Sequence, residues 1–208
     1  MYVDGYCERT APGLWGEPFN SVSNVAFLAA CVALLSLLAQ RRPVPPSVWL
    51  LAAIVGVVGL CSLSFHMLAT TFTAALDSLS IVVFILTAVV VLVHWMWGVR
   101  WRWAWLAAPA YLAGSIALVA VLVAVGGERA TLGGYLPALV GLVAFGLAAR
   151  SGLLLWAAGV FAVSLTLRTV DEPLCAQWPI GTHFLWHCLN ATVLSLVSYA
   201  VISASAEK

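Results

Sequence analysis

Seven long apolar runs fill most of the chain between residues 21 and 204, and they constrain its fold more than any other feature. A helix needs ~20 mainly apolar residues to cross a hydrocarbon core ~30 Å thick. The runs of about this length are 21–40, 47–68, 72–97, 103–125, 131–149, 153–169 and 181–204. They predict an all-α protein, in which seven transmembrane helices form one bundle domain over residues 1–208 and residues 1–20 form an N-terminal segment outside the membrane.

The composition agrees with a membrane protein and argues against other classes. Only 8% of the residues are charged and 63% are apolar, whereas soluble domains carry roughly 25% charged residues. The net charge is +1 and no basic stripe is visible, so we expect no nucleic-acid partner. The polar N-terminus lacks the apolar core of a cleavable signal peptide.

The positive residues between the runs predict the orientation. Six of them fall on one side of the bundle, namely Arg41, Arg42, Arg100, Arg102, Arg150 and Lys208. The other side carries Arg9, Arg129 and Arg168. Because positive residues accumulate in the cytoplasm, we expect the N-terminus outside and the C-terminus inside. The compact chain is compatible with a bacterial inner membrane, with the candidate site described below on the extracytoplasmic side.

Four ionisable residues are predicted at the outer ends of three helices. His66 is near the end of the second run, Asp77 near the start of the third, and His183 and His187 open the seventh. Ionisable residues inside membrane spans are costly and are functional-site candidates by default. The arginines alone gave the orientation, so the common depth of these four residues is an independent indication that they form one site.

The three histidines predict a metal site. His183 and His187 are four residues apart, which places both rings on one face of a helix, and His66 would supply a third nitrogen. Three imidazoles and an open position are the ligand set of a catalytic zinc. The alternatives are hydrogen-bonded bundle histidines, a proton relay, or a haem. The haem is less favoured because it needs one histidine on each of two facing helices.

Asp77 and Ser62 are candidates for catalysis. Asp77 could act as a general base toward an activated water or orient a histidine ligand, or it could simply be solvated. Ser62 lies one turn before His66 and could stabilise a developing oxyanion, or bond to its own helix. His94 lies 17 residues beyond Asp77, about 25 Å along the helix, so we exclude it from the site. Zinc chemistry in this setting predicts hydrolysis of a lipid amide or ester that enters from the membrane.

The N-terminal segment offers a second, weaker ligand set. Asp4, Glu8, Glu17 and Asn20 carry the oxygen ligands that calcium prefers, although they could equally form a solvated acidic cap. Cys7 and Cys175 lie in polar segments on the outer side, where a disulfide can form in an oxidising compartment. The remaining cysteines, Cys31, Cys61 and Cys188, lie in apolar runs and are interpreted as buried thiols.

The ordered motifs resemble those of the alkaline ceramidase family, within the wider superfamily that includes the adiponectin receptors. The similarity rests on CE at 7–8, EPFNSVSN at 17–24, SLSFH at 62–66 with Asp77, VDEPLC at 170–175 and THFLWH at 182–187. The loops and the fourth to sixth runs carry little recognisable signal.

The resemblance implies a seven-helix membrane amidase that cleaves ceramide or a related N-acyl lipid. In its terms His66, His183 and His187 bind zinc, while Asp77 and Ser62 lie beside the activated water. It also implies a disulfide between Cys7 and Cys175 and a calcium ion near Glu8 and Glu17. The chain departs from the family's calcium pattern at Gly5, with Asp4 one residue away, and at Thr10. The alternative function is a receptor-like or lipid-sensing protein with a structural zinc.

Overall fold

The computed structural model describes residues 1–41 and 43–206, and within this part of the chain the regular structure is helical. The α-helices are α1 Pro18–Ser23, α2 Val25–Gln40, α3 Pro46–Leu68, α4 Thr71–Trp97, α5 Trp101–Ala104, α6 Ala107–Gly126, α7 Leu136–Ala148, α8 Gly152–Leu174 and α9 His183–Ala206. Two short 3-10 helices, η1 Leu14–Gly16 and η2 Glu128–Thr131, complete the set. Arg42 and Lys208, which contributed to the predicted orientation, lie outside the described residues.

Seven helical segments are long and apolar enough to cross a membrane, which confirms the predicted fold class. They are Pro18–Gln40, Pro46–Leu68, Thr71–Trp97, Trp101–Gly126, Glu128–Ala148, Gly152–Leu174 and His183–Ala206. Some of these segments contain two helices. The first contains α1 and α2, and the fourth contains α5 and α6.

The fifth run, 131–149, agrees with the membrane-crossing segment Glu128–Ala148, in which Gly133 and Gly134 at positive φ separate η2 from α7. One predicted boundary was wrong. The sixth run was expected to end at residue 169, but α8 continues to Leu174 and carries Pro173 within it. The charged and proline residues near its end predicted a loop, yet Asp171 is buried there and takes part in the packing.

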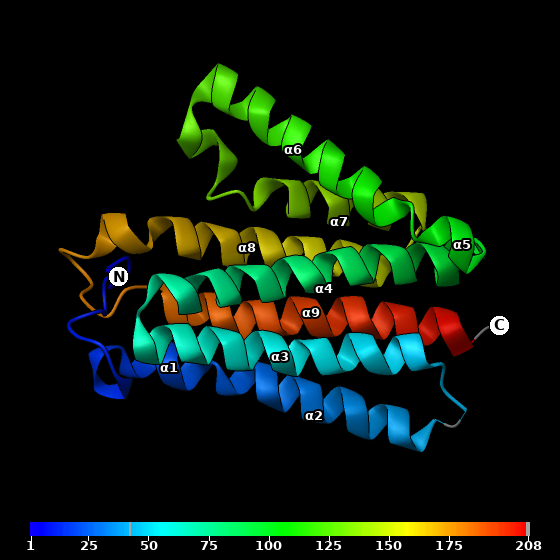
Figure 1. Ribbon diagram of the computed structural model, residues 1–208, viewed down its shortest axis with the longest axis horizontal. Helices are drawn as coiled ribbons and strands as arrows, with labels where there is room; N and C mark the ends of the chain where they lie inside the picture. The colour runs from blue at the N-terminus through cyan, green and yellow to red at the C-terminus, as the bar shows by residue number, and fades with distance from the viewer. Residues whose placement is uncertain (42, 207–208) are drawn as a thin grey trace.

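Helix α9 lies at the centre of the bundle (Figure 1) and packs against α1, α2, α3, α4 and α8. Helix α6 runs obliquely at the edge, against α4 and η2, and buries none of its described residues. In a membrane this exposed apolar surface faces lipid. The core therefore lies between α2, α3, α4, α8 and α9, and it carries the candidate site at one end.

The N-terminal segment closes the end of the bundle where α3 passes into α4. Tyr2 forms an isolated bridge with Thr70, and the amide of Val3 donates to the carbonyl of Ala69 at 2.8 Å. A disulfide joins Cys7 to Cys175 with a Cα separation of 5.0 Å, as predicted. The segment is thereby fixed to both α3 and the end of α8.

The remaining cysteines are free, and one of them corrects a prediction. Cys31 and Cys61 are half-buried, whereas Cys188 is exposed rather than buried. The apolar run around Cys188 predicted burial because a membrane helix is apolar on its lipid-facing side as well as on its core side.

The two ends of the bundle differ in character. The N-terminal segment, the α3–α4 turn and the start of α9 share one end, and the C-terminus lies at the other (Figure 1). Since the chain reverses at each connection, Arg41, Arg100 and Arg150 lie at the C-terminal end. Which end faces the cytoplasm stays a prediction from the positive-inside rule.

Candidate metal centre

Three buried histidines from two helices meet at the N-terminal end of the bundle. His66 lies in the last turn of α3, and His183 and His187 lie in the first two turns of α9. One ligand atom from each ring lies within 4.8 Å of the other two. The structure therefore brings together the three residues predicted from the sequence, and they could hold a metal ion. His94 lies at the opposite end of α4, stacked on Trp101 at 3.9 Å between ring centroids.

Hydrogen bonds fix the orientation of two of the rings. His66 Nδ1 lies 2.8 Å from Glu17 Oε2, and a carboxylate oxygen requires that the ring nitrogen donate. His187 Nδ1 lies 2.7 Å from Ser23 Oγ. The Ser23 hydroxyl donates to the carbonyl of Asn20 at 3.0 Å, so Ser23 accepts from His187. Both Nδ1 atoms then carry protons, and both Nε2 atoms keep a free lone pair.

The ring nitrogens fit a metal ion. His66 Nε2 and His183 Nδ1 are buried and have no hydrogen-bond partner among the described residues. Buried polar atoms in native proteins are nearly always paired, because an unpaired one costs free energy. A metal ion would satisfy these atoms, and a neutral imidazole set suits zinc, copper, iron or nickel.

Asp171 sets the start of α9 and hence the place of His183. Its Oδ1 accepts hydrogen bonds from the amides of Thr182 at 2.6 Å and His183 at 2.9 Å. The amide of Cys7 donates to Oδ2 at 3.1 Å. In the sequence Asp171 stands only as part of the VDEPLC motif, in a polar segment twelve residues before a ligand histidine, and no local signal marks it as the cap of α9.

Tyr6 covers the centre from the N-terminal segment. Its ring stacks on His183 with 3.8 Å between centroids and is tilted toward His66 at 5.3 Å. Burial raises the pKa of the Tyr6 phenol well above its ordinary value, so the phenol stays neutral at physiological pH. Sequence reasoning did not assign Tyr6, and its place beside Cys7 was the only signal.

Ser62 and Asp77 lie on neighbouring helices, and the two side chains interact electrostatically. Ser62 is buried in α3, one turn before His66. Asp77 Oδ1 is buried and has no partner within the described part of the chain. Asp77 does not belong to the group of mutually close ligand atoms, which contains only the histidines. This separation suits a residue that acts on a reactant rather than as a metal ligand.

A positive charge that the sequence analysis did not assign lies near Asp77. The Arg168 guanidinium packs over the rings of Tyr135 at 4.8 Å and Trp186 at 5.6 Å, and it interacts electrostatically with Asp77. A basic partner for Asp77 is not visible in the sequence, because Arg168 is 91 residues away along the chain. Arg168 comes from α8, which the tertiary structure places beside the site.

The four predicted calcium ligands differ in burial and in hydrogen-bond partners. Glu8 accepts hydrogen bonds from the amides of Phe19 at 2.7 Å and Asn20 at 2.8 Å, at the start of α1. Glu17 is fully buried and contacts Arg9, Asn20 and His66. Asp4 is exposed. Among the described residues, these acids do not form a group at metal-binding distance, and the calcium ion stays a prediction.

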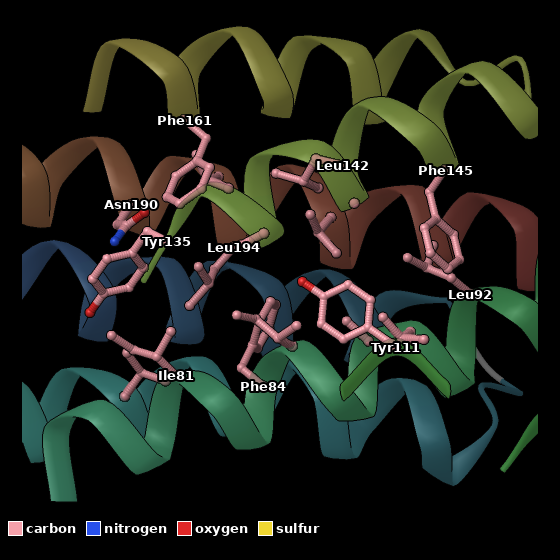
Figure 2. A pocket seen from close by; sticks show the side chains of 18 of the residues that line it. Ile81, Phe84, Leu92, Tyr111, Tyr135, Leu142, Phe145, Phe161, Asn190 and Leu194 are labelled. Atoms are coloured by element: carbon pink, nitrogen blue, oxygen red, sulfur yellow. The ribbon is translucent and has the colours of Figure 1, made fainter. Parts of the chain in front are cut away.

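An apolar pocket lies within the bundle (Figure 2). It lies mainly between α4, α7 and α9. Asn190 and Tyr135 lie near one end, and Phe145 and Leu92 near the other (Figure 2). Phe27 also lines the pocket, and its ring lies 6.3 Å from that of His187. The end of the pocket at Asn190 therefore lies about one turn beyond His187 on α9, while none of the three histidines lines the pocket itself.

A second, polar pocket opens beside Tyr6. Arg168, Asp171 and Glu172 contribute to its lining. The site therefore has an apolar side toward the bundle and a polar side toward the N-terminal end.

Comparison of the chain with protein-family models gives no match, and comparison with curated proteins gives none either. The resemblance noted in the sequence therefore stays a prediction, and the function is argued from the site.

Proposed function

We propose that this protein is a zinc-dependent membrane amidase that hydrolyses the amide bond of ceramide or a related N-acyl lipid to a fatty acid and an amine. The observation that carries the proposal is the buried group of three histidines, with an apolar pocket that begins at Asn190, about one turn further along α9. Hydrolysis of a lipid amide by a metal needs two parts, a set of metal ligands and a pocket for the hydrocarbon chain.

His66, His183 and His187 would hold the metal. A zinc ion in such a site lowers the pKa of a bound water to about 7 and polarises the substrate carbonyl. The protein's part is to keep the rings in the tautomer that directs a lone pair inward. Glu17 does this for His66, and Ser23 does it for His187.

Asp77 is the proposed proton carrier. Its carboxylate takes a proton from the attacking water and returns it to the nitrogen of the leaving amine, as the carbon–nitrogen bond breaks. The oxygen of that water ends in the fatty acid. The Ser62 side chain interacts with Asp77, and its hydroxyl is the group we assign to support the developing oxyanion.

The apolar pocket selects for a lipid. Its lining is almost entirely hydrocarbon and aromatic, and its polar groups are Asn190, Tyr135 and Tyr111. An acyl chain would lie along α9 toward Leu92, with its amide at the histidines. The polar pocket beside Tyr6 would receive the head group. With the N-terminus outside, the reaction takes place on the extracytoplasmic side of the membrane.

The test combines metal analysis with product analysis on the detergent-purified protein. About one zinc per chain, with fatty-acid release from ceramide or another N-acyl lipid of a panel, is the expected result. Asp77→Asn should keep the zinc and lose the release. One zinc without release from any lipid would overturn the amidase and favour the receptor-like alternative. A chain that binds no zinc would overturn the metal site itself.

A further inference from the structure

Arg9 forms a fully buried ion pair beside the metal centre. Its Nε contacts Glu17 Oε1, and both side chains are 0% exposed. The same guanidinium donates to the carbonyl of Val3 and packs over the Phe65 ring, 4.8 Å from its centroid. Since a buried charge is stable only when it is paired and hydrogen-bonded, these contacts define a built position for a cation.

The carboxylate of Glu17 is fully used by donors of this chain. Oε1 pairs with Arg9, and Oε2 accepts from Asn20 Nδ2 at 2.9 Å and from His66 Nδ1 at 2.8 Å. Calcium needs six to eight oxygen ligands. In Glu8 both carboxylate oxygens also accept backbone amides. The carboxylates of Glu8 and Glu17 thus already accept from donors of this chain, Asn20 Oδ1 is left as the buried predicted ligand without a partner among the described residues, and Asp4 is exposed. A positive charge, that of Arg9, already lies against Glu17.

We propose that Arg9 is a positioning residue that serves as an internal cation, holding Glu17 against His66 so that the metal centre assembles without calcium. The inference rests on the proposed metal site. In this proposal the guanidinium of Arg9, which is part of the chain, takes the place of the calcium ion predicted from the sequence.

The physical reason lies in the orientation of Glu17. The Arg9 guanidinium pairs with Oε1 and so holds Oε2 where it accepts from the His66 Nδ1–H. That hydrogen bond keeps the proton on Nδ1 and turns the Nε2 lone pair toward the metal. Arginine remains charged at every pH relevant to a protein, and it cannot dissociate as a bound ion can.

The test measures zinc affinity without any substrate. Purified wild-type protein is titrated against a chromophoric zinc chelator, once in buffer stripped of calcium and once with 1 mM calcium, a concentration chosen to be on the order of weak extracellular sites. We expect equal zinc affinity in both buffers. Arg9→Ala should bind zinc about 10- to 100-fold more weakly, the usual loss when a partner of a metal ligand is removed. Arg100→Ala, at the opposite end of the bundle, is the matched control and should bind as the wild type does.

Two further measurements separate positioning from general stability. Added methylguanidinium should restore zinc affinity to Arg9→Ala and leave Arg100→Ala unchanged, which a loss of fold would not allow. In the double variant Arg9→Met with Glu17→Gln no unpaired charge remains, so the chain can fold even if Arg9→Ala does not. If Arg9 acts through Glu17, this double variant should bind zinc as weakly as Glu17→Gln alone.

The outcomes distinguish this inference from the proposed function. Wild-type zinc affinity that rises with calcium, or an Arg9→Ala protein that binds zinc as the wild type does, would overturn the role of Arg9 and leave the amidase intact. A double variant that binds zinc clearly more weakly than Glu17→Gln would also overturn it. Wild-type protein that binds no zinc in either buffer would instead overturn the proposed function.

Discussion

Glu17 accepts a hydrogen bond from His66 Nδ1 at 2.8 Å, although 49 residues separate the two in the chain. Glu17 is the N-cap residue of α1, and His66 lies in the last turn of α3. Their contact makes the ring orientation of a candidate metal ligand depend on the N-terminal segment. The predictions below follow from this dependence and from the geometry around it.

Removal of a ligand histidine should abolish metal binding. His187→Ala leaves two nitrogens, too few for a stable site with neutral imidazoles. We expect the zinc content of the purified protein to fall from about one per chain to near zero by elemental analysis. His94→Ala, which changes a histidine at the other end of α4, should keep its zinc. A His187→Ala protein with full zinc content would refute the three-histidine site.

Asp77→Asn should separate metal binding from turnover. The amide is isosteric but cannot carry the proton, and loss of a general acid–base typically costs about 10²- to 10⁴-fold in rate. Zinc content should be unchanged, because Asp77 is not among the clustered ligand atoms. The matched control is Glu128→Gln on the exposed η2, which should keep its rate of fatty-acid release. Loss of zinc in Asp77→Asn would show instead that Asp77 is a ligand.

Ala138→Phe should shorten the acyl chain that the protein accepts. Ala138 lies on α7 and lines the apolar pocket, so the added ring fills space that we assign to the hydrocarbon chain. Release from short-chain N-acyl lipids should persist, while release from long-chain ones should fall about tenfold or more, roughly the effect of losing 1.4 kcal/mol of binding. Val140→Phe adds the same ring on the exposed side of α7 and should leave the chain-length profile as it is.

Gly181→Ala should weaken both the fold and the metal site. Gly181 has φ of +70°, and an added Cβ would lie 2.2 Å from Asp171 Oδ1, the atom that caps α9. The strained backbone alone costs about 1–3 kcal/mol, so we expect a lower Tm and weaker zinc binding. Gly159→Ala is the control, because it lies within α8 and its Cβ would meet open space. Equal Tm values for the two variants would contradict this account of the cap.

Loss of the disulfide should loosen the N-terminal segment. Cys7 and Cys175 are 168 residues apart in sequence, and cross-links over long loops typically stabilise by about 2–4 kcal/mol. Cys7→Ser should therefore lower the Tm and increase proteolysis near the N-terminus, and zinc should dissociate faster because Tyr6 and Glu17 lie on the same segment. Cys188→Ser, at an exposed and free thiol, should behave as the wild type in all three measurements.

Much of the bundle could be predicted because apolar length is a local property. Each span needs ~20 apolar residues, and the start of α3 after Pro45 was predicted to within a residue or two. The end of α8 and the start of α7 could not be predicted in this way. Gly133 and Gly134 lie before α7 at positive φ and separate it from η2. Asp171 and Glu172 predicted a loop, whereas their helix continues because Asp171 finds amide donors on α9.

The three ligand histidines could also be predicted, since a helical repeat and a common depth are both visible in a sequence. The partners of those histidines could not. Ser23 contacts His187 across 164 residues, and Arg168 reaches Asp77 from another helix. Glu17 was assigned to a calcium site because a sequence shows its oxygens without the donors that occupy them.

The sequence by itself determined that this chain is a seven-helix membrane bundle with three histidines at one end, because hydrophobicity and helical spacing act over short stretches of chain. The tertiary structure decided which nitrogen of His66 and His187 is free, where Asp171 holds α9, and which charge faces Glu17. Those features depend on hydrogen bonds and ion pairs between residues remote in sequence, whose free energy depends on distances that exist only in the folded chain.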